Sequence, residues 1–345
     1  MTATVNVALV GYGLAGSVFH APLIRHVPGL HLHTVVSSDA AKVHAADPRA
    51  RVVAATDEAL ADPEVGLVVI AAPNHLHAPL SLRALEAGKH VVVDKPFAPT
   101  LAEAQAVVAA AEAAGRTLTV FHNRRWDGDF LTLRRLVAAG ALGAIAELHS
   151  HFDRFRPQVA QRWRERPGAG TGLWFDLGPH LVDQALQLLG MPDAVEADLL
   201  RQRPDAEVDD YFHVVLHYPR ARVVLHAGSL VAAPAPRFAA HGSAASFLRH
   251  GLDPQEDALR RGQTPATAGF GVDPRPGSLV AGDGSIRELP LLPGDYAAFY
   301  AGVRDALLHG APPPVSAAEA LAVMHVLEAA AGSAAAGCRV ALREA

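Results

Sequence analysis

Three residues of this sequence, Lys95, Asp176 and His180, could exchange a proton with a substrate hydroxyl. Lys95 lies in Asp94-Lys95-Pro96, directly after an apolar run, where its ammonium group can donate a hydrogen bond to a developing alkoxide. Histidine titrates near neutral pH, and a carboxylate one helical turn from His180 can orient the imidazole and stabilise its charged form. The three residues therefore indicate acid-base chemistry on a carbinol.

Each of these residues also has a structural interpretation. Lys95 could be an ordinary lysine in a surface turn at the end of a strand. Asp176 could cap a helix that Pro179 begins, and His180 could be a hydrogen-bonded core histidine. For the Asp176 and His180 pair taken alone, the two interpretations are equally supported.

A dinucleotide site is indicated by the sequence GYGLAG at residues 11–16, which directly follows an apolar run and opens a predicted helix. In this context the glycines allow a tight turn, close approach to a pyrophosphate and packing of helix on strand, and the helix N-terminus stabilises phosphate charge. The alternative is a bare turn between strand and helix. The expected coenzyme contacts are Gly11, Gly13, Leu14, Ala15 and Gly16.

The residues after the second predicted strand favour NADP(H) over NAD(H). Enzymes that prefer NAD usually have a carboxylate there for the ribose hydroxyls, whereas this chain has Ser37, followed by Ser38 and Lys42. Hydroxyl groups and a cation suit a 2′-phosphate, which a carboxylate would repel. Asp39 is the alternative, because its side chain could turn inward toward the ribose.

The nineteen histidines make a metal site worth considering. His149 and His151 would share one face of a strand, as would His75 and His77 if that segment were extended. A catalytic zinc site also needs a third convergent ligand, and the sequence indicates none. We therefore predict chemistry without a metal, with zinc as the lesser alternative.

Over residues 1–121, short β-branched runs alternate with alanine- and leucine-rich helical stretches. This alternation is typical of a parallel sheet covered by helices on both faces, and it predicts an α/β doubly wound (Rossmann) domain over residues 1–121. Thr56 and Asn74 are candidate helix N-caps, and Thr100 with Glu103 forms a capping box for a helix that Gly115 ends. The predicted strands are Val5–Val10, Leu32–Val36, Arg51–Ala54, Leu67–Ala71, His90–Val93 and Leu118–Phe121.

Residues 122–345 have a different pattern, which predicts an α+β domain on one large, mostly antiparallel open sheet. A tight Pro219-Arg220 turn joins two of the strands as a hairpin. The segment Gly251–Glu288 is rich in glycine and proline and is expected to be irregular. The predicted strands are Ile145–Phe155, Ala194–Leu200, Tyr211–Tyr218 and Arg222–Leu230, and the predicted helices are Asp129–Ala139, Pro179–Leu189, Tyr296–His309 and Ala317–Ala331.

Composition narrows the class of protein. The net charge is -5, and lysine and arginine are scattered, so neither nucleic acid nor a membrane surface is an expected partner. The apolar start of the chain lacks a basic segment before it, which argues against a signal peptide. Cys338 is the single cysteine, so the chain cannot form an intrachain disulfide and a cytoplasmic location is expected.

Four motifs in this order and spacing resemble the glucose-fructose oxidoreductase and inositol dehydrogenase family (Gfo/Idh/MocA). They are GYGLAG, DKP, FHNRRW at Phe121–Trp126 and DLGPHLVD, and the likeness covers nearly the whole chain. The family usually has Glu-Lys-Pro where this chain has Asp94. The segments FHAPLI at residues 19–24, VDKPF at 93–97, FHNRRWD at 121–127 and SHFDRFRP at 150–157 resemble the family's branch of NADP-dependent scyllo-inositol 2-dehydrogenases.

This resemblance implies that Lys95, Asp176 and His180 are the catalytic set, with His180 as the acid/base and Lys95 beside the substrate oxygen. It also implies a substrate cleft between the two domains, and a homodimer or homotetramer formed through the exposed face of the second sheet. Further expected coenzyme contacts are Pro73, Asn74, His77, Asp94 and Lys95.

Hydrogen-bonding groups after residue 121 suit a polyol or sugar with several hydroxyls and an apolar ring face. Their alternative role is a salt-bridged surface. An aldose or amino-sugar dehydrogenase, a reductase of linear tetrapyrroles and a non-catalytic NADPH-binding regulator are the rival functions. Besides the catalytic set, the candidate substrate contacts are Asn123, Arg124, Asp127, Asp153, Arg156 and Trp163.

Overall fold

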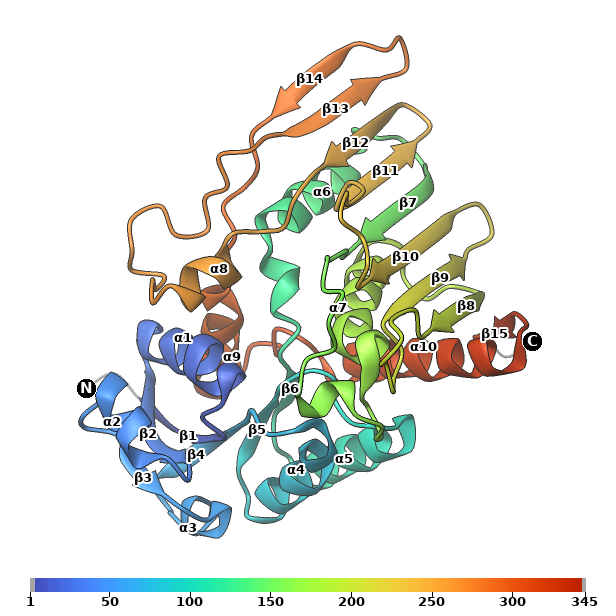
Figure 1. Cartoon of the computed structure of the whole chain (residues 1–345). Coiled ribbons are helices and arrows are strands. Elements are labelled where there is room, and N and C mark those ends of the chain that lie inside the picture. The colour runs from blue at the N-terminus through green and yellow to red at the C-terminus, as the bar shows by residue number, and fades with distance from the viewer. Residues whose placement is uncertain (1–3, 343–345) are drawn as a thin grey trace. The chain divides into compact units, whose positions relative to one another are not determined.

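Six parallel strands form a sheet in the order β3-β2-β1-β4-β5-β6 (Figure 1). The structure is a computed structural model, and it describes residues 4–342. This strand order is that of the doubly wound dinucleotide-binding fold, so the predicted fold class of the first domain is confirmed. The strands are β1 (Val5–Val10), β2 (Leu30–Val36), β3 (Arg51–Val53), β4 (Val65–Ile70), β5 (His90–Val93) and β6 (Leu118–Val120).

Helices follow the strands of this sheet, as the alternating sequence pattern predicts. Thr100 is the N-cap of its helix, since Glu103 N donates to Thr100 Oγ1, while the Glu103 carboxylate accepts from the Thr100 hydroxyl at 3.1 Å. Gly115, in the left-handed conformation, ends this helix as predicted. Thr56 and Asn74 are instead the first residues of their helices, after Ala55 and Pro73. The helices are η1 (Ala15–His20), α1 (Ala21–His26), α2 (Ala40–Ala46), α3 (Thr56–Leu60), η2 (Asn74–Leu76), α4 (His77–Glu86), α5 (Leu101–Ala114) and η3 (Asn123–Trp126).

The chain folds into two compact units that interleave along the sequence. The first unit takes the chain up to Trp126, together with Gln255–Phe270 and Asp295–Leu321. The second takes Asp127–Pro254, Gly271–Gly294 and the chain from Ala322 onward. Two segments from the C-terminal half, carrying α8 (Gln255–Arg260) and α9 (Ala297–His309), thus pack with the parallel sheet.

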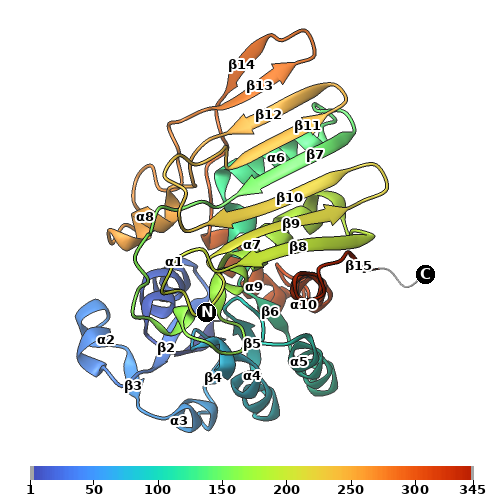
Figure 2. The ribbon, with the colours of Figure 1, turned by 45° about the vertical axis from the view of Figure 1, so that its right-hand side comes forward.

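The second unit is built on a nine-stranded sheet of order β14-β13-β12-β11-β7-β10-β9-β8-β15 (Figure 2). Only the pair β7 and β10 is parallel, so the predicted mostly antiparallel sheet is confirmed, as is the hairpin of β9 and β10. The strands are β7 (Ile145–His151), β8 (Ala194–Leu200), β9 (Tyr211–His217), β10 (Arg222–Gly228), β11 (Phe238–Gly242), β12 (Ala245–Arg249), β13 (Gly277–Ala281), β14 (Ile286–Leu289) and β15 (Val340–Ala341).

Several elements of this unit differ from the prediction. β7 ends at His151 and not at Phe155, although Phe152 and Arg154 still donate backbone hydrogen bonds to carbonyls of β10. The segment expected to be irregular contains α8, β13 and the start of β14. β14 is almost wholly exposed, and an exposed edge strand has no buried face to give it an alternating pattern. The hairpin of β11 and β12 was not predicted, because the two strands, FAAHG and ASFLR, contain no β-branched residue.

Helix α7 (Gly172–Leu189) begins seven residues before the predicted start at Pro179. Leu173 N donates to Asp209 O at 2.8 Å, and Trp174 N donates to Asp209 Oδ2 at 2.6 Å, so a distant loop satisfies the first turn. Trp174 is fully buried. The interpretation of Asp176 as a helix cap is therefore wrong, because Asp176 lies inside α7. Further helices are η4 (Trp163–Glu165) and α10 (Ala317–Ala336).

The nine-stranded sheet has one covered face and one open face. Helices α6 (Gly128–Ala138) and α7 lie on the covered face (Figure 2). Leucines of both helices and Val137 of α6 line the same space as Leu148 and Ala240 of the sheet. Side chains alternate along a strand, so His149 and His151, on either side of buried Ser150, point to the open face. Among residues 4–342, no helix combines the length and apolar character that crossing a membrane requires.

Candidate functional site

The glycine-rich turn after β1 has the geometry that its sequence predicts. Gly11 has a φ of +97°, and a Cβ there would lie 2.5 Å from Ala71 O at the end of β4. A Cβ on Gly16 would lie 2.1 Å from Gly11 O, whereas one on Gly13 would meet no atom within 4 Å. The turn is therefore tight at Gly11 and Gly16 and leaves open space at Gly13, which suits the approach of a pyrophosphate.

The carboxylate of Asp39 is engaged by the helix that it precedes. Asp39 Oδ1 accepts a hydrogen bond from Lys42 N at 2.9 Å and so caps α2. Lys42 Nζ donates to Tyr12 O, 2.9 Å away, which brings this cation to the glycine-rich turn. Ser37 Oγ accepts from Asp39 N at 3.1 Å. The end of β2 thus presents hydroxyl groups and an ammonium group.

Behind Lys95 lies a buried polar chain that the sequence analysis did not assign. Asp94 Oδ1 accepts from Lys95 N at 2.7 Å, and Asp94 Oδ2 lies 3.8 Å from His20 Nε2. On the other side of the ring, His20 Nδ1 is 2.6 Å from Tyr300 Oη. Burial alone would raise the pKa of Asp94, but His20, followed by Lys95 and His77, outweighs burial and lowers that pKa to about 2. Asp94 is therefore an anion that holds the backbone at Lys95.

The segment after β4 contains three of the predicted coenzyme contacts. Pro73 is exposed, Asn74 is 3% exposed and His77 is 1% exposed. Both ring nitrogens of His77 lie at carbonyl oxygens, Nδ1 at 2.7 Å from Pro96 O and Nε2 at 2.9 Å from Ala72 O. His77 thereby links the end of β4 to the segment that carries Lys95, which is a structural role within this unit.

Helix α7 carries Asp176 and His180 four residues apart, and therefore about one helical turn apart. His180 is 6% exposed, whereas the Asp176 side chain is 20% exposed and lies 3.7 Å from Arg164 Nε. Asp176 lines a partly open pocket together with Arg164 and the ion pair of Arg203 with Asp210. The carboxylate and imidazole expected to work together thus share one element.

A steric constraint explains the glycine in the DLGPH sequence of α7. A Cβ on Gly178 would lie 2.6 Å from the buried ring of Trp174, so only glycine lets this ring lie along the helix. Trp174 Nε1 donates to Leu327 O at 3.1 Å and its ring packs edge-on against Phe212 of β9. The position of Asp176 and His180 on the sheet is therefore set by this tryptophan.

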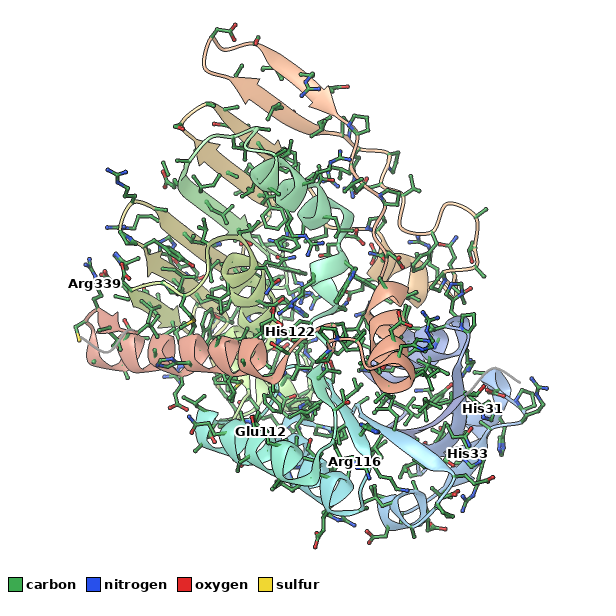
Figure 3. All side chains as sticks on the ribbon, turned by 180° about the vertical axis from the view of Figure 1, so that it is seen from behind. His31, His33, Glu112, Arg116, His122 and Arg339 are labelled. Atoms are coloured by element: carbon green, nitrogen blue, oxygen red, sulfur yellow. The ribbon has the colours of Figure 1, made fainter. Side chains whose placement is uncertain are left out.

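The predicted substrate contacts are distributed over several elements. Asn123 and Arg124 are buried on η3, which follows His122, labelled in Figure 3, and Arg124 is ion-paired with Glu256 at 2.5 Å. This pair matches the salt-bridged alternative for Arg124. Asp127 precedes α6 and is 1% exposed.

The other three candidates follow β7 in the second unit. Trp163 packs under Arg164, whose guanidinium carbon lies 4.6 Å from the ring centre, so it is joined to Asp176 through Arg164. Arg156 is exposed. Asp153 lies instead between two imidazoles, those of His151 and His226. Burial would raise the pKa of Asp153, but the two imidazoles outweigh burial and hold that pKa well below its usual range.

Lys95 belongs to the first unit and Asp176 and His180 belong to the second, so their convergence on one substrate stays a prediction. The sequence analysis missed His20, Tyr300 and Asp209 as supports of these residues. His20 lies in the FHAPLI segment, where its resemblance to the family was the available signal. Nothing local marked Tyr300 or Asp209, because their partners are far away in the sequence.

Comparison with known proteins identifies the family of both the N-terminal and the C-terminal part of the chain. Residues 5–122 match a family model described as "Oxidoreductase family, NAD-binding Rossmann fold" (GFO_IDH_MocA), and residues 134–342 match "Oxidoreductase family, C-terminal alpha/beta domain" (GFO_IDH_MocA_C). Together the two models cover most of the chain.

Individual relatives match over nearly their whole length. The uncharacterized oxidoreductase YdgJ of Escherichia coli is 49% identical, covering 95% of this chain and 96% of that protein. The scyllo-inositol 2-dehydrogenase (NADP(+)) IolW of Bacillus subtilis is 40% identical, covering 95% and 93%. The solved structure of yvaA from Bacillus subtilis superimposes with a TM-score of 0.97 at 38% identity and covers 99% of both chains.

Proposed function

Because the chain belongs to the Gfo/Idh/MocA oxidoreductase family, we propose that it is an NADP(H)-preferring dehydrogenase of a cyclitol or sugar. The favoured substrate is a ring like scyllo-inositol, the compound named for the relative from Bacillus subtilis. The observation that carries the proposal is the placement of Asp176 and His180 one turn apart on α7, in a chain that also keeps Lys95 at the end of β5.

The glycine-rich turn fits a dinucleotide, since the space at Gly13 is the kind that a Cβ would fill. Gly11 to Gly16 and the N-terminus of the helix after them would hold the pyrophosphate. The nicotinamide, when bound, accepts or supplies the hydride. Side chains of the protein carry out the proton transfer and stabilise the charges.

In the oxidative direction, His180 accepts the proton of the substrate hydroxyl as the C–H bond breaks and its hydride leaves. Asp176 orients the imidazole and stabilises its positive charge. Lys95 donates a hydrogen bond to the same oxygen and stabilises negative charge as it develops there. In reduction, His180 returns the proton and Lys95 polarises the carbonyl.

The preference for NADP(H) is supported by the end of β2. Asp39, the carboxylate that could have held the ribose hydroxyls, caps α2, while Lys42 lies at the glycine-rich turn. A 2′-phosphate at Ser37 and Ser38 would meet hydroxyl donors and a cation. The relative from Bacillus subtilis is named for NADP(+).

We further propose that the protein is a homodimer or homotetramer formed through the open face of the nine-stranded sheet. Leu200 pairs with Tyr211 in the register of β8 and β9 and is 44% exposed on this face. The proposal follows from the resemblance to the family, and Leu200 is an apolar position on this face where a variant can test it.

The decisive experiment measures formation of reduced nicotinamide by absorbance with a panel of inositols and aldoses, each with NADP⁺ and with NAD⁺. We expect turnover of a cyclitol and a higher kcat/KM with NADP⁺. Turnover of aldoses alone would replace the cyclitol assignment with a sugar one. A protein that binds NADPH tightly yet turns over no member of the panel would instead be a coenzyme-binding regulator.

A further inference from the structure

A cluster of two imidazoles and one carboxylate lies on the open face of the nine-stranded sheet. His226 Nδ1 is 2.8 Å from Asp153 Oδ1, and His151 Nδ1 is 3.5 Å from Asp153 Oδ2. One nitrogen or oxygen of each residue lies within 4.8 Å of those of the other two. Together, His151, Asp153 and His226 provide the three convergent ligands that a catalytic zinc site needs and that the sequence alone did not indicate.

Strand register explains why these residues meet. His226 of β10 is the cross-strand partner of His151 of β7, and partners on adjacent strands share a face. Asp153 follows β7 with the same alternation, two residues after His151, so it lies on that face too. His213 of β9 is the partner of His226 on its other side, with ring centres 6.0 Å apart.

The separations suit a transition metal. A tetrahedral zinc ion with bonds of about 2.0 to 2.1 Å keeps its donor atoms about 3.3 Å apart, between the two separations found here. The Nδ1 atom of His151 is shielded from solvent, and its contact with Asp153 Oδ2 at 3.5 Å is longer than a good hydrogen bond, so an ion between the two atoms would give both a closer partner. The side chains of His151 and His226 are 18% and 16% exposed, which leaves access for an ion and a water ligand.

We propose that His151, Asp153 and His226 form a binding site for one divalent transition-metal ion of the zinc type, with solvent completing the coordination. The donor set of two imidazoles and a carboxylate favours zinc, cobalt or nickel over calcium and magnesium, which prefer oxygen ligands. All three ligands come from a single chain, so one copy can bind the ion before any association of copies through this face.

This site is separate from the proposed dehydrogenase chemistry. Asp176 and His180 lie on α7, which packs on the covered face of the sheet, whereas the three ligands lie on the open face. Asp153 is therefore reassigned from the candidate substrate contacts to the metal site. The alternative is that Asp153 only accepts hydrogen bonds from two imidazoles.

The test uses untagged, full-length protein stripped with a chelator and then dialysed. Titration with Zn²⁺ in a calorimeter, and with Co²⁺ by its visible absorption, should give about one ion per chain and the spectrum of tetrahedral nitrogen and oxygen ligation. Asp153→Asn and His226→Gln should each weaken binding about 100-fold or more, because each removes a ligand. Circular dichroism and NADPH binding report whether each variant is folded.

His241→Ala is the matched control, because His241 lies on the neighbouring strand β11 and is bonded to Ser246 outside the cluster. A second control is His31→Ala, on β2 of the other unit beside His33, both labelled in Figure 3. Both control variants should bind zinc as the unmodified protein does. Binding well below one ion per chain would overturn the proposal, and so would unchanged affinity in a folded Asp153→Asn or His226→Gln variant.

Discussion

At the scale of single residues, the proposed chemistry depends on the amine of Lys95 and the imidazole of His180. Lys95→Ala and His180→Ala should each lower kcat by about 100-fold or more, the size expected when acid-base assistance to a proton transfer is lost. Steady-state kinetics on the best substrate of the panel gives kcat, and fluorescence titration with NADPH gives the dissociation constant, which should change little.

The control for these variants is Lys89→Ala, since Lys89 Nζ donates to the backbone carbonyls of Asp62 and Val65, away from the proposed site. This variant tests the loss of a buried lysine that takes no part in the proposed chemistry. Near-normal turnover in both Lys95→Ala and His180→Ala would refute the assignment of the catalytic residues.

Coenzyme preference also depends on single residues. Ser37→Asp places a carboxylate at the end of β2, where it repels a 2′-phosphate and can accept hydrogen bonds from ribose hydroxyls. We expect the ratio of kcat/KM for NADP⁺ to that for NAD⁺ to fall by about 10-fold or more, equivalent to about 1.4 kcal/mol. Ser285→Asp, in the exposed turn before β14, should leave the ratio unchanged.

At the scale of elements, the glycine-rich turn separates a binding role from a structural one. A Cβ on Gly13 meets no protein atom, so Gly13→Ala should fold normally and bind NADPH about 10-fold or more weakly, as a side chain enters the phosphate position. A Cβ on Gly16 meets Gly11 O, so Gly16→Ala should lower the melting temperature. Thermal unfolding and NADPH titration of both variants check this contrast, and equal destabilisation would contradict it.

The N-terminus of α7 makes stability depend on pH through Asp209. Burial, the largest cause, with a contribution from Asp210, raises the pKa of Asp209 to about 6 despite the backbone donors at Leu173 and Trp174. The folded protein therefore holds this proton more tightly than the unfolded chain does. The contribution of protonated Asp209 to the free energy of unfolding is therefore fully present below about pH 4 and is lost as the pH rises through about 6.

Asp209→Asn keeps an oxygen for the Trp174 N–H but cannot ionise. As the pH rises from 4.5 to 7.5, the unmodified protein should lose the contribution of Asp209, whereas the variant has no such loss. The free energy of unfolding of the variant relative to that of the unmodified protein should therefore rise by about 1 to 3 kcal/mol, which corresponds to a pKa shift on the order of two units. Urea unfolding at several pH values measures the change. Asp205→Asn, exposed in the same loop, is the control, and parallel pH profiles for all three proteins would contradict the role of Asp209.

At the scale of the whole molecule, the open face of the large sheet is expected to join copies of the chain. Leu200→Lys should shift the mass in solution toward the monomer at micromolar concentration, because it places a charge in an apolar contact. Sedimentation equilibrium measures that mass. Leu82→Lys, which changes an exposed apolar residue on α4 of the first unit, is the control.

The periodicity of apolar residues and the spacing of short motifs were enough to predict most of the first sheet and the glycine-rich turn. Alternating apolar runs located all six parallel strands to within two residues, and the glycine spacing located the turn after β1. The four-residue spacing of Asp176 and His180 sets them one turn apart on any helix that contains both. These features depend on neighbours along the chain, so they can be read without the fold.

Other features depend on residues far apart along the chain and emerge only when it is folded. The start of α7 is set by Asp209, 35 residues after Trp174, and the anion behind Lys95 is held by His20 and, through it, Tyr300. The cluster of His151, Asp153 and His226, proposed above as a metal site, forms because strand register places His226 beside His151. Register and distant capping arise when a whole sheet is assembled, so no window of sequence contains them.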